Sequence, residues 1–457
     1  MTLTVSVDEV VEESNNPLLN SHNSWERIRL KEVADVLNGS SFSSDYFTKE
    51  KGIPLLRIRD IGDTTTEKNF SGKYEDKYVV HPGDLVVGMD GDFICDLWSG
   101  PKALLNQRVC KITPDEAVYN RKFLYYVLQP YLNAIHARTS ATTVKHLSST
   151  DVKDIPLPQP PISEQKQIVV KIEELFSKLD SGTNELENVN KQLKRYRRSI
   201  MKKAFRGGLT REYSDIRPEN SVDQEFSSNN EDASFPKYSN RSKVPNQWHC
   251  ASLEDVFSFR NGEGLPKDNR NPGNYPVYGG NGKTDTHDEW NMESSALVIG
   301  RVGANCGNVH ISPPKSWITD NAIYTKEIKI EISLKYCWLL LSSYPLNSLS
   351  GGTGQSYISQ KTLKSIDIPL PPISEQREIA NRLDTQLSLI RNIKEMLSIE
   401  QQKSRGLRQA ILKQAFIGKL VPQNQAGEPT KESSQSEDIN PELGKQKTLS
   451  EVTNDVE

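Results

Sequence analysis

The stretch from Val277 to Thr284 is the part of the chain most similar to a phosphate-binding loop, because it ends in Gly282-Lys283-Thr284. Such a loop opens with glycine and leads into a helix, so that backbone N–H groups and the lysine surround the phosphates. Here Val277 occupies the first position, and no strong helical pattern follows. The stretch therefore predicts a structural turn, or a loop facing a different polar ligand, rather than a nucleotide site.

A second stretch, Asn271-Pro272-Gly273-Asn274-Tyr275, is faintly similar to the Asn-Pro-Pro-Tyr motif of amino-methyltransferases. Its second proline is missing, and no glycine-rich cofactor loop after a strand accompanies it. No acidic cluster with lysine indicates a nuclease, and no serine, histidine and aspartate residues form a nucleophile elbow. The sequence therefore predicts no catalytic residues and no cofactor held by this chain.

The cysteines give no sign of a metal site or a disulfide scaffold. They are scattered, without a Cys-x-x-Cys pair or a histidine at ligand spacing, and comprise Cys95, Cys110, Cys250, Cys306 and Cys337. We expect reduced, buried thiols and no metal. The N-terminus lacks the basic start and apolar core of a signal peptide, and no stretch approaches about 18 apolar residues, so we expect a cytoplasmic protein without membrane contact.

The net charge of −3 hides a strongly basic segment from residue 191 to residue 206. That segment contains no acidic residue and eight cations, namely Lys191, Lys194, Arg195, Arg197, Arg198, Lys202, Lys203 and Arg206. Lys194, Arg198, Lys202 and Arg206 are near neighbours on one side of a helix by their spacing. The segment is predicted either to be a solvated or partner-contacting helix face or to contact phosphates directly.

The elements that position these residues occur twice. The run Pro160-Pro-Ile-Ser-Glu-Gln165 recurs as Pro371-Pro-Ile-Ser-Glu-Gln376, within a match displaced by 211 residues from Leu147 to about Thr210. Trp25 and Trp248 open the two copies at matching places, where we expect core anchors rather than stacking platforms. The chain therefore contains one domain-plus-helix design twice.

The scaffold of the copies agrees while their loops differ. Short apolar runs bounded by proline and glycine predict strands at residues 53–58 and 84–88, and at 275–278 and 296–300. In the aligned loops, residues 57–60 face residues 279–282, and Arg108 faces Ala322. Helices are predicted at 123–135 and 334–346. Shared scaffold with different loops indicates two related tasks on different targets.

Each proline-rich run is predicted to open a long helix, with Ser163 or Ser374 as N-cap and Glu164 or Glu375 in the first turn. Apolar residues then repeat at a spacing close to 3.5, which is typical of a coiled coil; Gln386, Glu400 and Ser404 interrupt the second stripe. We expect the helices to pair antiparallel, or to dock partners, through Ile168, Ile172, Leu175, Leu179, Leu186 and Leu193, and through Ile379, Leu383, Ile390, Ile393, Leu397 and Leu407.

The predicted fold is α+β, with two repeated domains separated by an antiparallel pair of long helices. The expected parts are a weakly structured arm (1–24), a first domain (25–155), a first helix (156–210), a polar linker (211–246), a second domain (247–366), a second helix (367–421) and an acidic, disordered tail (422–457).

With these features the sequence resembles the specificity subunit of type I restriction–modification systems. The resemblance is carried by the two proline-rich helix starts, the endings at Phe205 and Phe416, the tryptophan openings and the stretch from Gly351 to Ser359, over about residues 25–420. It implies two target recognition domains that each read one half of a split DNA site. It also implies helices that set the spacing and dock two methyltransferase subunits, with restriction subunits attached and with methyl donor, ATP and magnesium on these partners.

Polar side chains in the domain loops are the candidate base readers, because arginine, lysine, asparagine and glutamine match guanine or adenine edges in the major groove. In the first domain these are Arg57, Arg59, Lys102, Arg138, Thr142, Thr143 and Lys145. In the second they are Lys267, Arg270, Asn281, Lys283, Arg301, Asn305, Gln355, Ser356 and Tyr357. For each single residue a structural or solvent-facing role stays open.

The hypothesis is a non-catalytic subunit that recognises double-stranded DNA. One alternative is a self-contained DNA methyltransferase or nuclease with its own target domains, which requires an active site absent from the pattern. Another is a helical scaffold without a DNA role.

Overall fold

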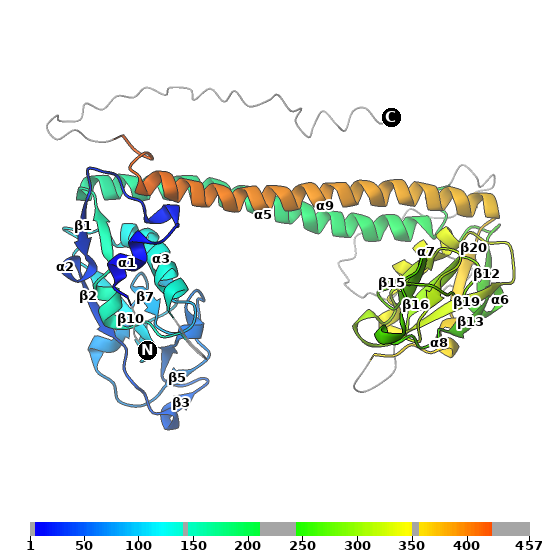
Figure 1. Ribbon diagram of the computed structural model, residues 1–457, viewed down its shortest axis with the longest axis horizontal. Coiled ribbons are helices and arrows are strands. Elements are labelled where there is room, and N and C mark those ends of the chain that lie inside the picture. The colour runs from blue at the N-terminus through cyan, green and yellow to red at the C-terminus, as the bar shows by residue number, and fades with distance from the viewer. Residues whose placement is uncertain (1–4, 140–144, 211–243, 350–355, 423–457) are drawn as a thin grey trace. The chain divides into compact units, whose positions relative to one another are not determined.

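The computed structural model describes residues 5–139, 145–210, 244–349 and 356–422 (Figure 1). The predicted linker and acidic tail lie almost wholly outside these ranges. The chain forms two compact units, of which unit 1 takes Met1–Phe176 with Arg408–Glu457 and unit 2 takes Ser177–Leu407.

Unit 1 contains two sheets with helix α3 packed against the first. The four-stranded sheet has the order β2-β10-β7-β8, and the five-stranded sheet has the order β3-β5-β4-β9-β6. Strands β1 and β11 form a separate antiparallel pair. The bounds are α1 Val7–Glu12, β1 Glu26–Arg29, α2 Leu30–Val33, β2 Ala34–Asn38, β3 Phe47–Thr48, β4 Ile53–Leu56, β5 Asn69–Phe70, β6 Val79–Val80, β7 Leu85–Gly88, β8 Cys95–Leu97, β9 Ala103–Leu105, β10 Val109–Pro114, α3 Arg121–Arg138, α4 Ser149–Lys153 and β11 Pro156–Gln159.

Unit 2 repeats this plan. Its four-stranded sheet has the order β13-β19-β16-β17, a three-stranded sheet has the order β15-β14-β18, and β12 pairs with β20. The bounds are β12 His249–Ser252, α6 Leu253–Val256, β13 Phe257–Asn261, β14 Tyr275–Gly279, β15 Gly282–His287, β16 Ala296–Gly300, β17 Val309–Ser312, β18 Trp317–Ile318, β19 Ala322–Ile328, α7 Leu334–Ser343, α8 Gln360–Lys364 and β20 Asp367–Leu370.

The strand registers correct one detail of the repeat alignment. Val109 pairs with Gly88 in unit 1, and Ala322 pairs with Gly300 in unit 2, so Val109 and not Arg108 corresponds to Ala322. Arg108 therefore corresponds to Asn321. The loops contain different residue types, so the sequence alone could not fix which residues correspond there.

The N-terminal arm is ordered where the sequence predicted weak structure. Helix α1 is closed by a capping box between Ser6 and Glu9, and Val7, Val10 and Val11 are buried. These valines join the core of unit 1 because their spacing of three and four residues puts them on one helix face. The polar residues around them concealed this short pattern.

The two long helices are α5, Ile162–Ala204, and α9, Ile373–Phe416. Each begins one residue before the predicted serine cap, because the carbonyls of Pro161 and Pro372 accept the N–H of the glutamine four residues later at 3.0 Å. The side chains of these glutamines are buried. The proline-rich runs therefore do start the helices, as predicted.

Each glutamine bonds the helix start to its own domain. Gln165 accepts from the N–H of Asn120 at 2.7 Å and donates to the carbonyl of Pro160 at 2.8 Å. Gln376 makes the same bonds to Ser333 and Pro371, each at 2.9 Å. The domain and the first turn of its helix are therefore one hydrogen-bonded structure.

Each unit also takes up a helix end from the other copy of the repeat. Phe416, at the end of α9, is buried in the core of unit 1, where its carbonyl accepts from the N–H of His22 at 3.2 Å. Phe205, just after α5, is buried in the core of unit 2 against the ring of Tyr336, with centroids 5.5 Å apart. The two phenylalanines thus anchor the helix ends.

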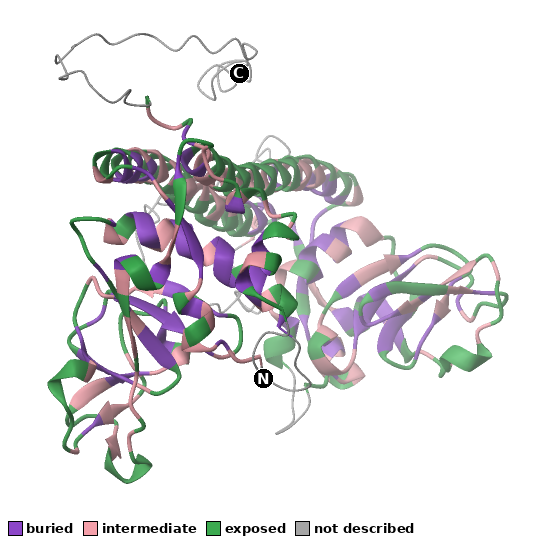
Figure 2. Ribbon diagram, turned by 60° about the vertical axis from the view of Figure 1, so that its left-hand side comes forward, coloured by how far each residue is buried: buried purple, intermediate pink, exposed green. Residues whose placement is uncertain are grey.

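The predicted apolar stripes divide into three groups. Residues of the first turns are buried in the domain cores, namely Ile168, Ile172, Ile379 and Leu383, and Ile390 is buried as well. Leu175, Leu179, Leu186, Leu193, Ile393 and Leu397 are half-buried. Leu407 is 52% exposed, so the structure does not place it in a buried seam. Figure 2 shows exposed residues along much of both helices.

Within unit 2 the helices run antiparallel, as predicted. Thr183 lies 3.3 Å from Ser404 between hydroxyl oxygens, and further along α5 the Tyr196 hydroxyl donates to Gln386 at 3.1 Å. Two of the polar interruptions in the second stripe are therefore partners of polar residues in α5. None of the helices that the structure describes is long and apolar enough to cross a membrane.

Candidate nucleic-acid interface

The loops that differ between the repeats meet at one edge of each domain. In unit 1 three backbone N–H groups donate to backbone carbonyls. Asn106 donates to the carbonyl of Leu56 at 3.1 Å, Met89 to that of Arg108 at 3.0 Å, and Leu147 to that of Met89 at 2.7 Å. These backbone bonds gather residues 57–60, 89–92, 106–108 and 145–147, which together we call the loop face of unit 1.

Unit 2 makes the same bonds at the matching places. The N–H of Thr319 donates to Tyr278, that of Arg301 to Asn321, and that of Ile358 to Arg301, each at 2.9 Å. The loop face of unit 2 therefore consists of residues 279–282, 301–305, 319–321 and 356–358. The same backbone frame holds different side chains in the two units.

Glycine allows close backbone crossings in the loop face of unit 2. A Cβ at Gly300 would lie 2.0 Å from the carbonyl oxygen of Asn305, and one at Gly280 would lie 3.2 Å from the Cα of Gly300. At Gly300 only glycine allows the backbone segments to cross so closely, whereas a side chain at Gly280 would need its neighbour to shift by a few tenths of an ångström. In unit 1, Arg57 and Ile58 stand where unit 2 has Gly279 and Gly280.

Arg57 belongs to the loop face of unit 1, but its guanidinium is engaged within the domain. Its Nε lies 3.2 Å from the buried carboxylate of Asp60, and its Nη2 lies 2.8 Å from Glu67. These carboxylates raise the pKa of Arg57 against the opposing effect of burial. Arg59 points into solvent and lies 3.8 Å from Glu67. The geometry thus leaves Arg59 freer than Arg57 to meet a ligand.

The other predicted readers of unit 1 are spread over several elements. Lys102 is exposed just before β9. Arg138, at the end of α3, forms an ion pair with Glu13. Lys145 is on the loop face, where its Nζ donates to the carbonyl of His136 at 2.6 Å. Thr142 and Thr143 lie outside the described residues.

In unit 2 the predicted residues Arg301 and Tyr357 form a pair. The Arg301 guanidinium lies over the Tyr357 ring at 5.1 Å from its centroid, and its Nη2 is 3.5 Å from the phenol oxygen. Asn305 and Ser356 lie beside them in the loop face, while Gln355 lies outside the described residues. This pair combines hydrogen-bond donors with an aromatic surface that is partly exposed.

The remaining predicted residues of unit 2 surround the β14–β15 hairpin. Asn281 and Lys283 are exposed at its turn, and the pairing of Gly279 with Gly282 makes this stretch the turn of a hairpin. Arg270 forms an ion pair with Asp285 at 3.1 Å, and Lys267 is exposed nearby. Arg301, Asn305, Asn281 and Lys283 are therefore on or next to the loop face, whereas Arg270 is engaged in the fold.

One cluster on the loop face of unit 1 was not predicted from the sequence. His146 Nδ1 donates to Asp90 Oδ1 at 2.6 Å, and Arg108 Nε lies 3.2 Å from Asp90 Oδ2. His146 corresponds to Tyr357, because each pairs with the loop that follows an equivalent strand. His146 bridges Asp90 after β7, and Tyr357 bridges Val302 after β16. The signal that could have revealed this cluster was the 211-residue displacement, which places His146 opposite the predicted Tyr357.

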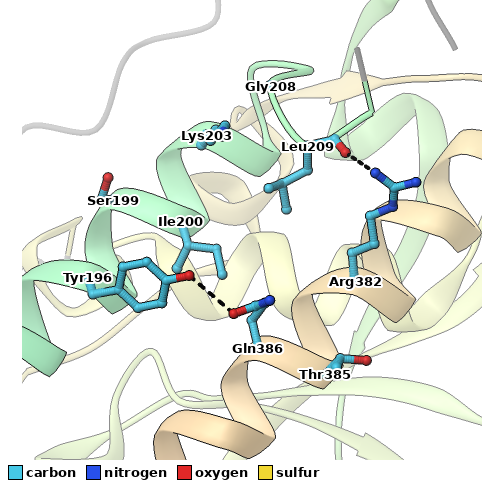
Figure 3. A pocket seen from close by; sticks show the side chains of 9 residues that line it. All are labelled: Tyr196, Ser199, Ile200, Lys203, Gly208, Leu209, Arg382, Thr385 and Gln386. Atoms are coloured by element: carbon cyan, nitrogen blue, oxygen red, sulfur yellow. Dashed lines mark hydrogen bonds between the residues drawn. The ribbon is translucent and has the colours of Figure 1, made fainter. Parts of the chain in front are cut away.

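A pocket of about 610 Å³ lies elsewhere in unit 2, between the end of α5 and the start of α9 (Figure 3). Arg382 donates to the carbonyl of Leu209 at 2.7 Å on one side, and Tyr196 bonds Gln386 on the other. Arg382 also pairs with Glu378 at 2.6 Å, which offsets its charge. The pocket belongs to the helix pair and is not on the loop face.

The basic segment of α5 is a solvated surface in part. Lys194, Arg195, Arg197 and Arg198 are exposed.

Across the described ranges, no group of three or more histidine, cysteine, aspartate or glutamate residues could hold a metal ion. Cys95, Cys110, Cys306 and Cys337 are buried free thiols as predicted, and Cys250 is half-buried.

Comparison with known proteins matches two segments of the chain to one family. The type I restriction modification DNA specificity domain matches residues 22–194 and again residues 245–401. The chain belongs to this family. The specificity subunit of the type I restriction enzyme EcoBI from Escherichia coli is 32% identical, over 94% of this chain and 93% of that protein.

Two solved structures share the fold of this chain. One, from a study of complex assembly and conformational transition of the type I restriction–modification system, has a TM-score of 0.64 at 18% identity and covers 88% of this chain and 99% of the other. The HsdS subunit from Thermoanaerobacter tengcongensis has a TM-score of 0.51 at 18% identity, over 88% of this chain and 98% of the other. The doubled α+β architecture is therefore that of the family.

Proposed function

We propose that this chain is the DNA-recognition subunit of a type I restriction–modification complex, in which each unit reads one half of a split, asymmetric site. The observation that carries the proposal is the pair of loop faces. One backbone frame, held by three equivalent hydrogen bonds, presents Asp90, Arg108 and His146 in unit 1 but Arg301, Asn321 and Tyr357 in unit 2. Two readers of different base sequences require this combination of shared frame and different side chains.

The helices are proposed to set the distance between half-sites and to dock two methyltransferase subunits, with restriction subunits attached to these. Helix α9 supports a docking role because Leu389, Met396 and Leu407 are more than half exposed. Their spacings of seven and eleven residues place them on one side of the helix. An exposed apolar stripe of this kind favours burial against another protein.

The chain is proposed to bind no cofactor of its own and to carry out no chemistry. Methyl donor, ATP and magnesium belong to the partner subunits in this proposal, and the complex acts in the cytoplasm. The predicted base readers retain their proposed role as sets, with Arg59, Lys145, Lys283, Arg301, Asn305 and Tyr357 best placed to meet DNA.

Methylation-sensitive sequencing of DNA from cells carrying this chain and its methyltransferase partner tests the proposal. The expected result is one bipartite motif, methylated in both halves. Replacing the loop-face side chains of unit 2, by Arg301→Ala with Tyr357→Phe, is expected to relax or abolish recognition of one half and leave the other half unchanged.

Two outcomes contradict the proposal. Methylation or cleavage of DNA by the purified chain alone would favour a catalytic protein. A reconstituted complex whose DNA binding is absent, or insensitive to both sequence and salt, would favour a helical scaffold, because phosphate contacts necessarily make binding salt-dependent.

A further inference from the structure

The cluster at Asp90 holds an arginine in a form suited to reading a base. Asp90 Oδ2 lies 3.2 Å from Nε of Arg108, and Asp90 Oδ1 accepts from His146 at 2.6 Å. The ion pair makes its closest approach through Nε, which leaves the terminal amines Nη1 and Nη2 for a ligand. The Arg108 side chain is 52% exposed, so these amines are open to solvent.

The aspartate is itself held in place from two sides. Asp90 forms the isolated bridge with His146, and the N–H of Gly91 donates to the carbonyl of Lys145 at 3.1 Å. The Asp90 side chain is only 22% exposed. A carboxylate fixed in this way restrains the arginine more than a mobile surface carboxylate would, and so reduces the entropy that the arginine loses on binding.

We propose that Arg108 reads a guanine in the half-site recognised by unit 1, with Asp90 as its positioning residue and His146 fixing Asp90. Two parallel N–H donors match the O6 and N7 acceptors of guanine in the major groove, and this is the pairing that arginine makes most specifically. The proposal rests on the proposed function and names one base for one half-site.

The counterpart in unit 2 supports a reading role over a structural one. Asn321 stands where unit 1 has Arg108, and Tyr357 stands where it has His146. A structural ion pair needed by the frame would be retained in both copies, yet the frame of unit 2 forms without it. An ion pair with a half-exposed arginine also contributes little to folding, so this cluster serves something other than stability.

The test measures binding of the reconstituted complex, with its methyltransferase subunits, to duplexes carrying its own site and to duplexes with one base pair of the site changed at a time. Arg108→Ala is expected to weaken binding to the native site by about 5- to 150-fold, the value of one bidentate base contact. At one G·C pair of the unit 1 half-site the variant is expected to show no further loss. Lys122→Ala is the matched control, because Lys122 is 53% exposed and forms an ion pair with Glu173 in the same unit.

Asp90→Asn separates positioning from simple charge. It removes a negative charge, so binding to non-specific DNA is expected to strengthen, while discrimination at the same G·C pair is expected to fall. A merely structural aspartate would not change discrimination at a single base pair. Arg108→Lys is expected to retain phosphate attraction but to lose this discrimination, because lysine lacks the planar fork.

If Arg108→Ala weakens binding equally for all duplexes, Arg108 is a phosphate contact. If binding does not change, Arg108 is only a surface ion pair. Either result overturns this inference without affecting the proposed function. A wild-type complex without preference for any site would overturn the proposed function and this inference together.

Discussion

Trp248 donates its indole N–H to the carboxylate of Glu375 at 3.0 Å, across 127 residues of sequence. Glu375 is buried in the first turn of α9 and also accepts the hydroxyl of Thr210 at 2.6 Å. The start of the second domain, the segment after α5 and the start of α9 are thereby joined inside unit 2. Trp25, at the matching place in unit 1, is buried as well, but its indole N–H has no partner among the described residues.

This difference predicts unequal effects of the same substitution. Trp248→Phe leaves a buried carboxylate short of one donor, whereas Trp25→Phe removes a similar ring without breaking such a bond. We expect Trp248→Phe to cost about 1.5–3 kcal/mol more in the unfolding free energy of its unit, as for a hydrogen bond to a charged group. Hydrogen exchange in urea, resolved by segment, measures each unit separately. Equal losses would show that the bond to Glu375 contributes nothing.

Gly182 in α5 and Gly406 in α9 predict stabilising substitutions. A Cβ at either position would meet no heavy atom within 4 Å. Gly182→Ala and Gly406→Ala are therefore each expected to stabilise the helix by about 0.5–1 kcal/mol, because alanine loses less backbone entropy than glycine in a helix. Slower amide exchange around each site is the measurement. Gly307→Ala is the control of opposite sign, since its φ of 85° is unfavourable for alanine and its Cβ would lie 2.7 Å from Asn347.

Burial predicts which thiols react. It raises the pKa of Cys110 to about 12 and also raises the pKa values of Cys95 and Cys337. At pH 8 the thiolate fraction of Cys110 is therefore on the order of 10⁻⁴, and it increases only as the pH approaches the raised pKa. The half-buried Cys250 is expected to label first with a thiol reagent. Cys250→Ser should remove the fast phase, and a fast phase that persists would place a reactive thiol elsewhere.

The helix pair predicts a change of spacing. One heptad inserted into both α5 and α9 adds about 10 Å to each helix, which corresponds to about three base pairs of DNA. We expect a longer unread spacer, or loss of activity, with both half-site sequences unchanged; methylation-sensitive sequencing reads this directly. Insertion into α5 alone breaks the pairing of Tyr196 with Gln386 and is expected to abolish activity. An altered half-site would contradict the spacing role.

Local patterns in the sequence were sufficient for much of the fold. The strand at Ala296–Gly300, the helix starts at the two Pro-Pro-Ile-Ser-Glu-Gln runs and the core positions of Trp25 and Trp248 all follow from apolar periodicity, proline and repetition. The short helix α1 did not follow, because three valines among polar residues are a weak signal until α3 supplies the surface that buries them.

The sequence by itself determined that the chain is a duplicated α+β design with two long helices and no recognisable catalytic motif. These features depend only on the spacing of residues along the chain and on the similarity between its two halves. Only the tertiary structure decided which polar side chains are free. Arg57 and Arg59 are the same residue type two positions apart, yet the buried Asp60 pairs with the first and the second lies in solvent. Asp90, Arg108 and His146 meet only because backbone hydrogen bonds bring three distant loops to one edge, and hydrogen-bond partners far apart in sequence leave no periodic pattern.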